Sequence, residues 1–177
     1  MAACAVFLDR DGVLVETFVR DNRAYAATTL QDFQLVRSAA AEVRRLRDAG
    51  LAPIVVTNQP DVGRGVIAPE TLAAMHERLA SALPVLDILV CTHVASVGCA
   101  CRKPKPGMLE AAAAKWGIDL RQSFMVGDRA SDVEAGRAAG CRTILIERPY
   151  SGSATADARV GSLTEAVDAI LTRWSPR

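Results

Sequence analysis

The chain has 177 residues, half of them apolar, and its 21 basic and 20 acidic residues leave a net charge of +1. This length predicts one domain, spanning residues 1–177, with a hydrophobic core of its own, and the near-neutral charge offers no footprint for nucleic acid or an anionic membrane. No apolar run approaches the roughly 20 residues of a transmembrane helix, and no charged segment precedes the first apolar run, so neither a membrane span nor a signal peptide is expected.

Short apolar strands alternate with helices along the chain. The strands are apolar runs bounded by charge or glycine, and the helices carry apolar residues three or four positions apart. In chain order we expect strand 3–8, helix 38–50, strand 51–58, helix 69–83, strand 85–91, helix 106–117, strand 123–128, helix 131–140 capped by Ser131, strand 142–147 and helix 162–174. The alternation predicts an α/β fold, a doubly wound Rossmann-like parallel sheet with right-handed crossovers. Sites in such sheets lie beyond the carboxyl ends of the strands.

The first strand ends in DRDG, and a period of two places Asp9 and Asp11 on the same side of the departing chain. On its own this pair is as consistent with a solvated acidic turn as with a site. The later strand ends and their loops add the hydroxyl of Thr57, the cation of Lys103 and the carboxylate of Asp128. Together these groups predict a site for Mg²⁺ and a phosphoryl group, because Mg²⁺ prefers oxygen ligands and leaves room for phosphate oxygens and water.

Three of the five cysteines and one of the two histidines gather within eleven residues: Cys91, His93, Cys99 and Cys101. Four such ligands close a tetrahedral zinc shell and leave no position for water, which indicates a structural zinc in the loop 91–101. The alternatives are four unrelated residues or a labile disulfide. Zinc would order this loop and so hold Arg102 and Lys103, which follow it, in fixed positions.

The remaining cysteines and histidine carry less information. Cys4 and Cys141 adjoin predicted strands and are expected to be buried thiols, and His76 is expected to be a surface or half-buried residue of a helix. The odd number of cysteines argues against a secreted disulfide framework, so we expect a protein of the reducing cytosol.

Four segments in this order resemble the four motifs of haloacid dehalogenase (HAD)-type phosphatases: DRDG, VVTNQ, RKPKPGM and GDRASD. The resemblance covers residues 5–146, and no long insertion follows the first or third strand, which implies a form without a large cap domain. The resemblance implies that Asp9 is the nucleophile that forms an aspartyl-phosphate, and that Asp11 is first the general acid and then the general base.

The same resemblance implies a ligand set. Mg²⁺ would be held by Asp9, Asp128 and the backbone carbonyl of Asp11, while Thr57 and Lys103 would bind the phosphoryl oxygens. The second acid of the fourth motif, Asp132, would support the metal shell and the lysine without binding the ion directly.

The cysteine-rich loop running into CRKPKPGM, with TNQPDVGRG, is similar to a narrower group, the D-glycero-D-manno-heptose-1,7-bisphosphate 7-phosphatases and related histidinol-phosphatase domains. By this resemblance Arg102 and Arg129 contact the second, non-reacting phosphate or the sugar, because arginine binds anions bidentately. Arg64 is a further candidate, equally well explained as a surface charge. Other substrate contacts are expected from Arg10, Asn58 and Gln59.

One segment departs from this group. Val15 stands where the group commonly has asparagine, and residues 15–26 form a flap that is a few residues longer than in the shortest members. Thr17, Arg20, Arg23 and Tyr25 are candidates to line it.

The expected activity is removal of the 7-phosphate of heptose 1,7-bisphosphate, a small phosphorylated sugar, by a monomer that supplies nucleotide-activated heptose for surface polysaccharide. The alternative substrate is histidinol phosphate, whose amine suits the two arginines poorly. A DNA-end phosphatase of this fold would need a basic groove. An alternative of another class is a phospho-aspartate receiver domain, which would lack the DRDG turn and the zinc loop.

Overall fold

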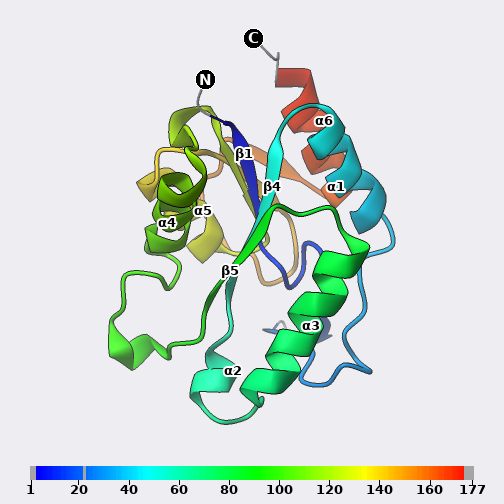
Figure 1. Cartoon of the computed structure of the whole chain (residues 1–177), viewed down its shortest axis with the longest axis vertical. Helices are drawn as coiled ribbons and strands as arrows, with labels where there is room; N and C mark the ends of the chain where they lie inside the picture. The colour runs from blue at the N-terminus through cyan, green and yellow to red at the C-terminus, as the bar shows by residue number, and fades with distance from the viewer. Residues whose placement is uncertain (1–2, 22, 174–177) are drawn as a thin grey trace.

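The computed structural model describes residues 3–21 and 23–173, with the backbone alone for residue 23 (Figure 1). Its strands are β1 (Ala5–Leu8), β2 (Phe18–Arg20), β3 (Arg23–Tyr25), β4 (Ala52–Asn58), β5 (Asp87–Cys91), β6 (Phe124–Gly127), β7 (Arg142–Ile146) and β8 (Ala158–Val160). Its helices are α1 (Ala39–Asp48), α2 (Pro60–Gly63), α3 (Pro69–Ala82), α4 (Gly107–Trp116), α5 (Ala130–Ala138) and α6 (Leu163–Arg173), with 3₁₀ turns at Ala95–Val97 and Leu120–Gln122.

The main sheet contains six parallel strands in the order β5-β4-β1-β6-β7-β8. The five strands expected from the sequence are β1, β4, β5, β6 and β7, so the predicted doubly wound parallel sheet is confirmed. β1 lies at its centre, where Leu8 pairs with Val55 on one side and with Val126 on the other. This register brings the carboxyl ends of three strands level with one another.

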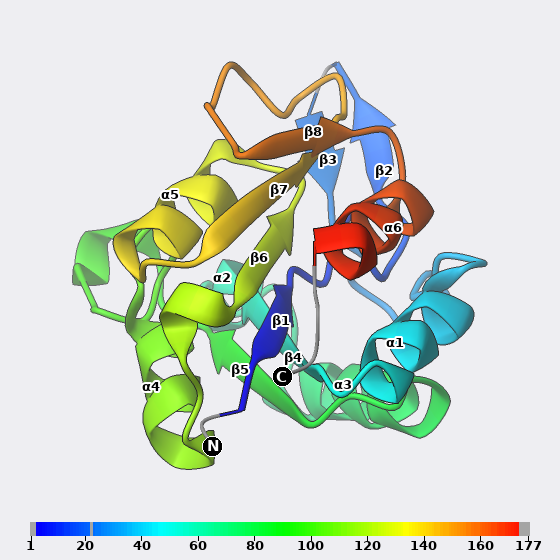
Figure 2. The same ribbon diagram turned by 90° about the horizontal axis from the view of Figure 1, so that it is seen from above.

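Helices cover both faces of the sheet, and each face has its own core (Figures 1 and 2). Successive side chains of a strand point to opposite faces. In β1, Val6 and Leu8 pack with residues of α1, α3 and α6, whereas Ala5 and Phe7 pack with residues of α4 and α5. β1 is therefore buried on both sides, as a central parallel strand should be.

Three details differ from the sequence expectations. β8 was not predicted, because three residues after a polar loop carry no detectable period. The β2–β3 hairpin, in which Phe18 pairs with Tyr25, was not predicted for the same reason. The cap of α5 was assigned wrongly. The helix begins at Ala130, and the carboxylate of Asp132 accepts the backbone N–H of Arg129 at 3.0 Å, so Ser131 lies inside the first turn.

The segment between β1 and α1 carries, in its described part, only the β2–β3 hairpin as regular structure. The last helix was expected to reach residue 174, which lies outside the described residues. Among the helices described, none combines the length and apolarity needed to cross a bilayer.

Candidate active site

The polar side chains predicted from the strand ends converge at one edge of the sheet. Asp9 follows β1, Thr57 lies near the end of β4, and Asp128 follows β6. A cavity of about 930 Å³ opens at this edge. Its floor includes Asp9 and Lys103, and the hairpin contributes Phe18, Tyr25 and their neighbours to its wall. The predicted position of the site at the carboxyl ends of the strands is thus where the structure has a cavity of substrate size.

Three carboxylates meet within the site. Oxygen atoms of Asp9, Asp128 and Asp132 all lie within 4.8 Å of one another, and all three residues are buried. Burial, together with the charges of Asp9 and Asp132, raises the pKa of Asp128 to about 7. Oδ1 of Asp128 is buried without a hydrogen-bond partner among the described residues, and its nearest cation is Nε of Arg129 at 4.0 Å. Buried carboxylates this close together repel one another, and a cation between them would stabilise their charged forms.

Lys103 supplies part of that charge. Its Nζ lies 2.7 Å from Oδ1 of Asp9 and 2.6 Å from Oδ1 of Asp132, and it also donates to the carbonyl of Val56. Burial opposes the charged form, but the attraction of Asp132 and Asp9 outweighs it, so the pKa of Lys103 is raised. Asp132 therefore lies where it was predicted to support the lysine. Asp132 also lies close to Asp9 and Asp128, a proximity that the sequence did not indicate.

Asn58 fixes the loop that carries this lysine. Its amide donates to the carbonyl of Lys103 at 3.0 Å, and its Oδ1 accepts the backbone N–H of Lys103 at 3.1 Å. The end of β4 is in this way pinned to the segment that follows the cysteine cluster. Asn58 also lines the cavity, so its predicted contact with substrate is compatible with its position.

Asp11 is held by two neighbours. The guanidinium of Arg10 donates to both of its carboxylate oxygens at 3.1 Å, and Nε2 of Gln59 donates to Oδ2 at 2.6 Å. Gln59 uses its other amide proton for Oγ1 of Thr57 at 2.8 Å. Because Thr57 accepts this bond, its own hydroxyl proton remains available to a phosphoryl oxygen. Gln59 thus connects the two residues, a relation the sequence did not suggest.

Arg10 lies differently from what was expected of a substrate-binding residue. It is fully buried and does not line the cavity. Its guanidinium carbon lies 5.3 Å from the ring centroid of Phe33, and Nη1 lies 3.3 Å from Nε2 of His76. Arginine has no acceptor, so Nε2 accepts. In this conformation the guanidinium of Arg10 is directed at Asp11, not into the cavity.

His76 is half-buried, as predicted. Desolvation, together with the charge of the adjacent Arg10, lowers its pKa to about 4. The neutral ring is therefore the acceptor that completes the hydrogen bonding of Arg10. The sequence identified His76 only as a helical residue, because the partner is 66 positions away.

Four arginines line the cavity: Arg20 of the hairpin, Arg64, Arg102 and Arg129. Arg102 donates to the carbonyl of His93 at 3.2 Å, and Arg129 donates to the carbonyl of Ala24 in the hairpin at 3.2 Å. Arg64 also lines the cavity but pairs with Asp61 at 2.9 Å, with its side chain 55% exposed. The structure therefore gathers the predicted anion-binding cations on one cavity.

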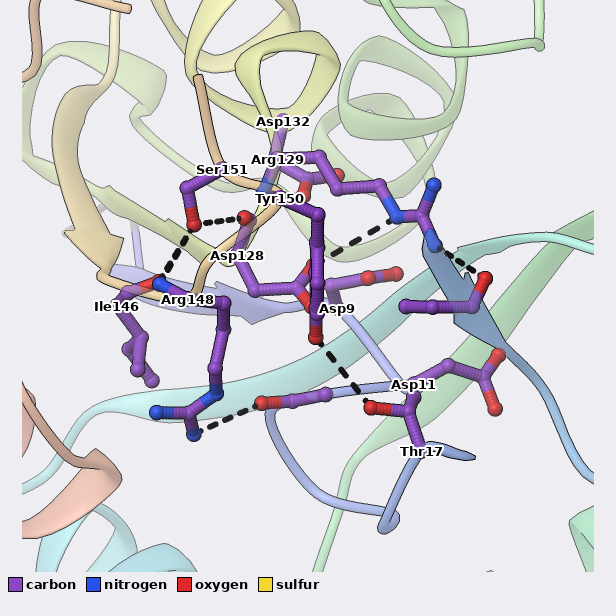
Figure 3. Close-up of polar contacts among 12 residues, drawn as sticks. Asp9, Asp11, Thr17, Asp128, Arg129, Asp132, Ile146, Arg148, Tyr150 and Ser151 are labelled. Carbon is purple, nitrogen blue, oxygen red and sulfur yellow. Dashed lines mark hydrogen bonds and ion pairs between the residues drawn. The ribbon is translucent and has the colours of Figure 1, made fainter. Parts of the chain in front are cut away.

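The loop after β7 adds residues that the sequence did not indicate (Figure 3). The hydroxyl of Tyr150 donates to Oδ2 of Asp128 at 2.7 Å, and Oγ of Ser151 donates to the backbone carbonyl of Asp128 at 2.6 Å. No motif marks this loop. The only available signal was its place directly after the fifth predicted strand, at the same edge of the sheet.

The cysteine cluster closes as predicted. The Sγ atoms of Cys91, Cys99 and Cys101 lie 3.2–3.7 Å apart, and Nδ1 of His93 lies 3.3 Å from Sγ of Cys101. These spacings suit four ligands around one ion at the usual Zn–S and Zn–N lengths of about 2.3 and 2.0–2.1 Å. Cys4 and Cys141 are buried elsewhere, as expected.

With this geometry described, comparisons with known proteins identify the family. A HAD-hydrolase-like family model matches residues 100–170. The D-glycero-beta-D-manno-heptose-1,7-bisphosphate 7-phosphatase of Pseudomonas aeruginosa is 37% identical over 152 residues, 83% of each chain. The chain belongs to the HAD-like hydrolases. The family resemblance of the four motifs is thereby confirmed.

Other HAD relatives match over nearly the whole length. The D-glycero-D-manno-heptose-1,7-bisphosphate 7-phosphatase of Thermosynechococcus vestitus is 36% identical, and the match covers 98% of each chain. The crystal structure of the D,D-heptose 1,7-bisphosphate phosphatase from B. bronchiseptica, complexed with magnesium and phosphate, is similar with a TM-score of 0.84 at 27% identity. That match covers 97% of this chain and 99% of the other.

Proposed function

We propose that this protein is a Mg²⁺-dependent phosphatase that removes the 7-phosphate of D-glycero-D-manno-heptose 1,7-bisphosphate through an aspartyl-phosphate on Asp9. The supporting observation is the buried cluster of Asp9, Asp128 and Lys103, of which Asp9 and Lys103 line the cavity, in a chain similar to enzymes of that name. The wider proposal is a single-domain cytosolic enzyme, active as a monomer.

The acid cluster suits a magnesium ion. Asp9 and Asp128 offer hard oxygen ligands, and the unpartnered, buried Oδ1 of Asp128 is the kind of atom that a cation would satisfy. The backbone carbonyl of Asp11 is the third proposed ligand. When bound, Mg²⁺ would neutralise charge on the transferring phosphoryl group.

The nucleophile is Asp9. Lys103 occupies its Oδ1, which leaves the other carboxylate oxygen to attack phosphorus. The P–O bond to the sugar breaks, and the leaving oxygen takes a proton from Asp11. Asp11 then removes a proton from water, the water oxygen attacks phosphorus, and the Asp9–phosphate bond breaks to release phosphate. Thr57 and Lys103 bind the phosphoryl oxygens throughout, so that catalysis is mainly positioning and charge neutralisation.

The second phosphate accounts for the arginines. Arg102 and Arg129 both line the cavity and each presents a planar donor fork. A bisphosphate uses both anion sites, whereas histidinol phosphate would place an ammonium group beside them. This favours the heptose substrate over the histidinol alternative. The closed zinc loop and the roomy cavity favour a hydrolase over a receiver domain, which stores its phosphoryl group.

We also infer a structural zinc at Cys91, His93, Cys99 and Cys101. Four soft or borderline ligands in mutual contact suit zinc and leave no open position for catalysis. The loop leads directly to Lys103, whose backbone is pinned by Asn58. Zinc is proposed to fix one end of this segment while Asn58 fixes the other.

Initial rates test the proposal. Purified protein with Mg²⁺ is assayed with both anomers of heptose 1,7-bisphosphate, histidinol phosphate and fructose 1,6-bisphosphate. The expected result is the highest kcat/KM for a heptose bisphosphate. A preference for histidinol phosphate would refute the proposed substrate and leave the proposed mechanism intact. If phosphate is released from none of these compounds, the proposal that the protein is a phosphatase is refuted.

A further inference from the structure

Tyr150 lies where three parts of the site meet. It follows β7, and its hydroxyl donates to Oδ2 of Asp128 at 2.7 Å (Figure 3). The same hydroxyl oxygen lies 3.3 Å from Oγ1 of Thr17, which precedes the hairpin. The guanidinium carbon of Arg129 lies 5.4 Å from the centroid of the Tyr150 ring.

The hydroxyl has one proton, and its direction can be assigned. Carboxylate oxygens only accept, so the phenol proton points to Asp128, and Thr17 donates to the phenol oxygen. The bond occupies Oδ2 of Asp128 and leaves Oδ1 without a hydrogen-bond partner among the described residues.

The ring serves a different neighbour. Arg129 has a side chain that is 48% exposed, and its terminal Nη2 reaches the carbonyl of Ala24 in the hairpin. The face of an aromatic ring attracts a guanidinium and restricts its rotamers. Tyr150 therefore packs against the guanidinium of Arg129, while the hairpin accepts a hydrogen bond from Nη2 of the same group.

The loop that carries Tyr150 is itself fixed. Ser151 donates to the carbonyl of Asp128, and Arg148 donates to the carbonyl of Gly12 at 3.3 Å. A Cβ at Gly12 would lie 1.9 Å from Oδ2 of Asp128 and 3.0 Å from the Tyr150 hydroxyl. The turn after Asp11 must therefore be glycine for the phenol and the carboxylate to meet there. The contact is built into the packing of three separate segments.

We propose that Tyr150 is a positioning residue with two separable roles. Its hydroxyl orients Asp128 so that Oδ1 faces the cation, and its ring orients Arg129 toward the substrate. The inference rests on the proposed function, because it assumes that Asp128 binds a divalent cation and that Arg129 binds the non-reacting part of the substrate.

The first role is tested by cation binding without turnover. Mn²⁺, which replaces Mg²⁺ at oxygen sites and whose free form is counted by electron paramagnetic resonance, is titrated into the full chain in the absence of substrate. Tyr150→Phe removes the hydroxyl and keeps the ring, and it should weaken Mn²⁺ binding about tenfold. Thr172→Val removes a hydroxyl of α6 that donates to the backbone carbonyl of Asp168, outside the cavity lining, and should leave Mn²⁺ binding unchanged.

The second role is tested by comparing two substitutions at saturating Mg²⁺. Tyr150→Phe keeps the ring under Arg129, so KM for heptose 1,7-bisphosphate should stay near the wild-type value. Tyr150→Leu removes the ring as well, and KM should rise about fivefold. A merely structural role would lower the unfolding temperature of both variants and change kcat, KM and Mn²⁺ binding without this division.

The outcomes separate this inference from the proposed function. A wild-type chain that binds no Mn²⁺ would overturn the cation site itself. A wild-type chain that binds Mn²⁺, with Tyr150→Phe binding it equally well, would overturn the role of the hydroxyl alone. If Tyr150→Phe does not fold, Thr17→Val removes the donor to the phenol oxygen and should still weaken Mn²⁺ binding about twofold, and no change would contradict the inference.

Discussion

The acid cluster and the cysteine cluster are both groups of potential metal ligands, but they are built in opposite ways. The carboxylates of Asp9, Asp128 and Asp132 are buried, Asp9 and Asp132 line the cavity, and Oδ1 of Asp128 has no hydrogen-bond partner among the described residues. The cysteine cluster is partly exposed, and its four ligand atoms already surround a single point. A carboxylate cluster that keeps an oxygen free of hydrogen bonds can bind a further ion and take part in catalysis. A closed set of four ligands has no free position and can only hold its loop in place.

The two regions meet at Lys103. Its side chain belongs to the acid cluster, and its backbone continues from the cysteine cluster through Arg102. Experiments can therefore test whether the two clusters have separate roles. Substitutions in the acid cluster should change catalysis most, and substitutions in the cysteine cluster should change stability and catalysis together.

The largest effect is expected at the nucleophile. Asp9→Asn removes the attacking carboxylate and should lower kcat by about a thousandfold or more, with little change in the unfolding temperature, because Asp132 still pairs with Lys103. Phosphate release from the bisphosphate measures it. Asp48→Asn, on the surface of α1, is the matched control and should keep wild-type rates. Normal turnover by Asp9→Asn would refute the assignment.

Lys103→Met should come next. The substitution leaves Asp9 and Asp132 buried without their cation, which costs roughly 3–5 kcal/mol of folding free energy, and it removes a phosphoryl-binding charge worth about a hundredfold or more in kcat. Urea unfolding and initial rates measure the two effects. Lys105→Met, two residues along and exposed, should have neither effect. Equal losses in both variants would mean that the loop, and not the buried charge, is responsible.

Cys101→Ser tests the proposed support role of zinc. Loss of one ligand should lower the zinc content and the unfolding temperature, and displacement of Lys103 should lower kcat about tenfold or more. Metal analysis, thermal unfolding and initial rates are compared with those of Cys141→Ser, a buried thiol outside the cluster that should keep its zinc. If Cys101→Ser is as stable and as active as the wild type, the cysteine cluster does not support Lys103.

The smallest effect concerns pH. The folded-state pKa of His76, about 4, lies below its ordinary value of 6.5, so the unfolded chain binds the proton more readily. The stability that depends on the neutral ring is present above pH 6.5 and is lost as the pH falls toward 4. His76→Gln keeps an acceptor for Arg10 and does not titrate. Its unfolding temperature should therefore fall less between pH 7 and pH 5 than that of the wild type, and parallel curves would contradict this account.

Much of this architecture could be read from local patterns. The apolar runs predicted β1, β4, β5, β6 and β7, because a strand buried on both faces is a continuous run of such residues. Asp9 and Asp128 were identified as candidates because the carboxyl ends of parallel strands meet at one edge, Asp132 because of the family resemblance, and the cysteine cluster because its members lie within eleven residues.

Residues without a local pattern could not be placed. Arg10 stands beside Asp11 in the sequence and was expected to contact substrate, yet it is buried against Phe33 and His76 from distant segments. Tyr150 follows no motif and reaches Asp128 only because β6 and β7 are neighbours in the sheet. Such relations depend on which segments pack together.

The sequence by itself therefore determined the order of five strands of the main sheet and of the five longer helices, the edge at which the site lies and the residues that could serve as metal ligands. These follow from hydrophobic periodicity and from the chemistry of side chains close in sequence. Only the tertiary structure decided which oxygen of Asp128 is left without a partner, which way Arg10 points and which residue supports Arg129. The physical reason is that directional hydrogen bonds and burial depend on atoms brought together from segments far apart in the chain.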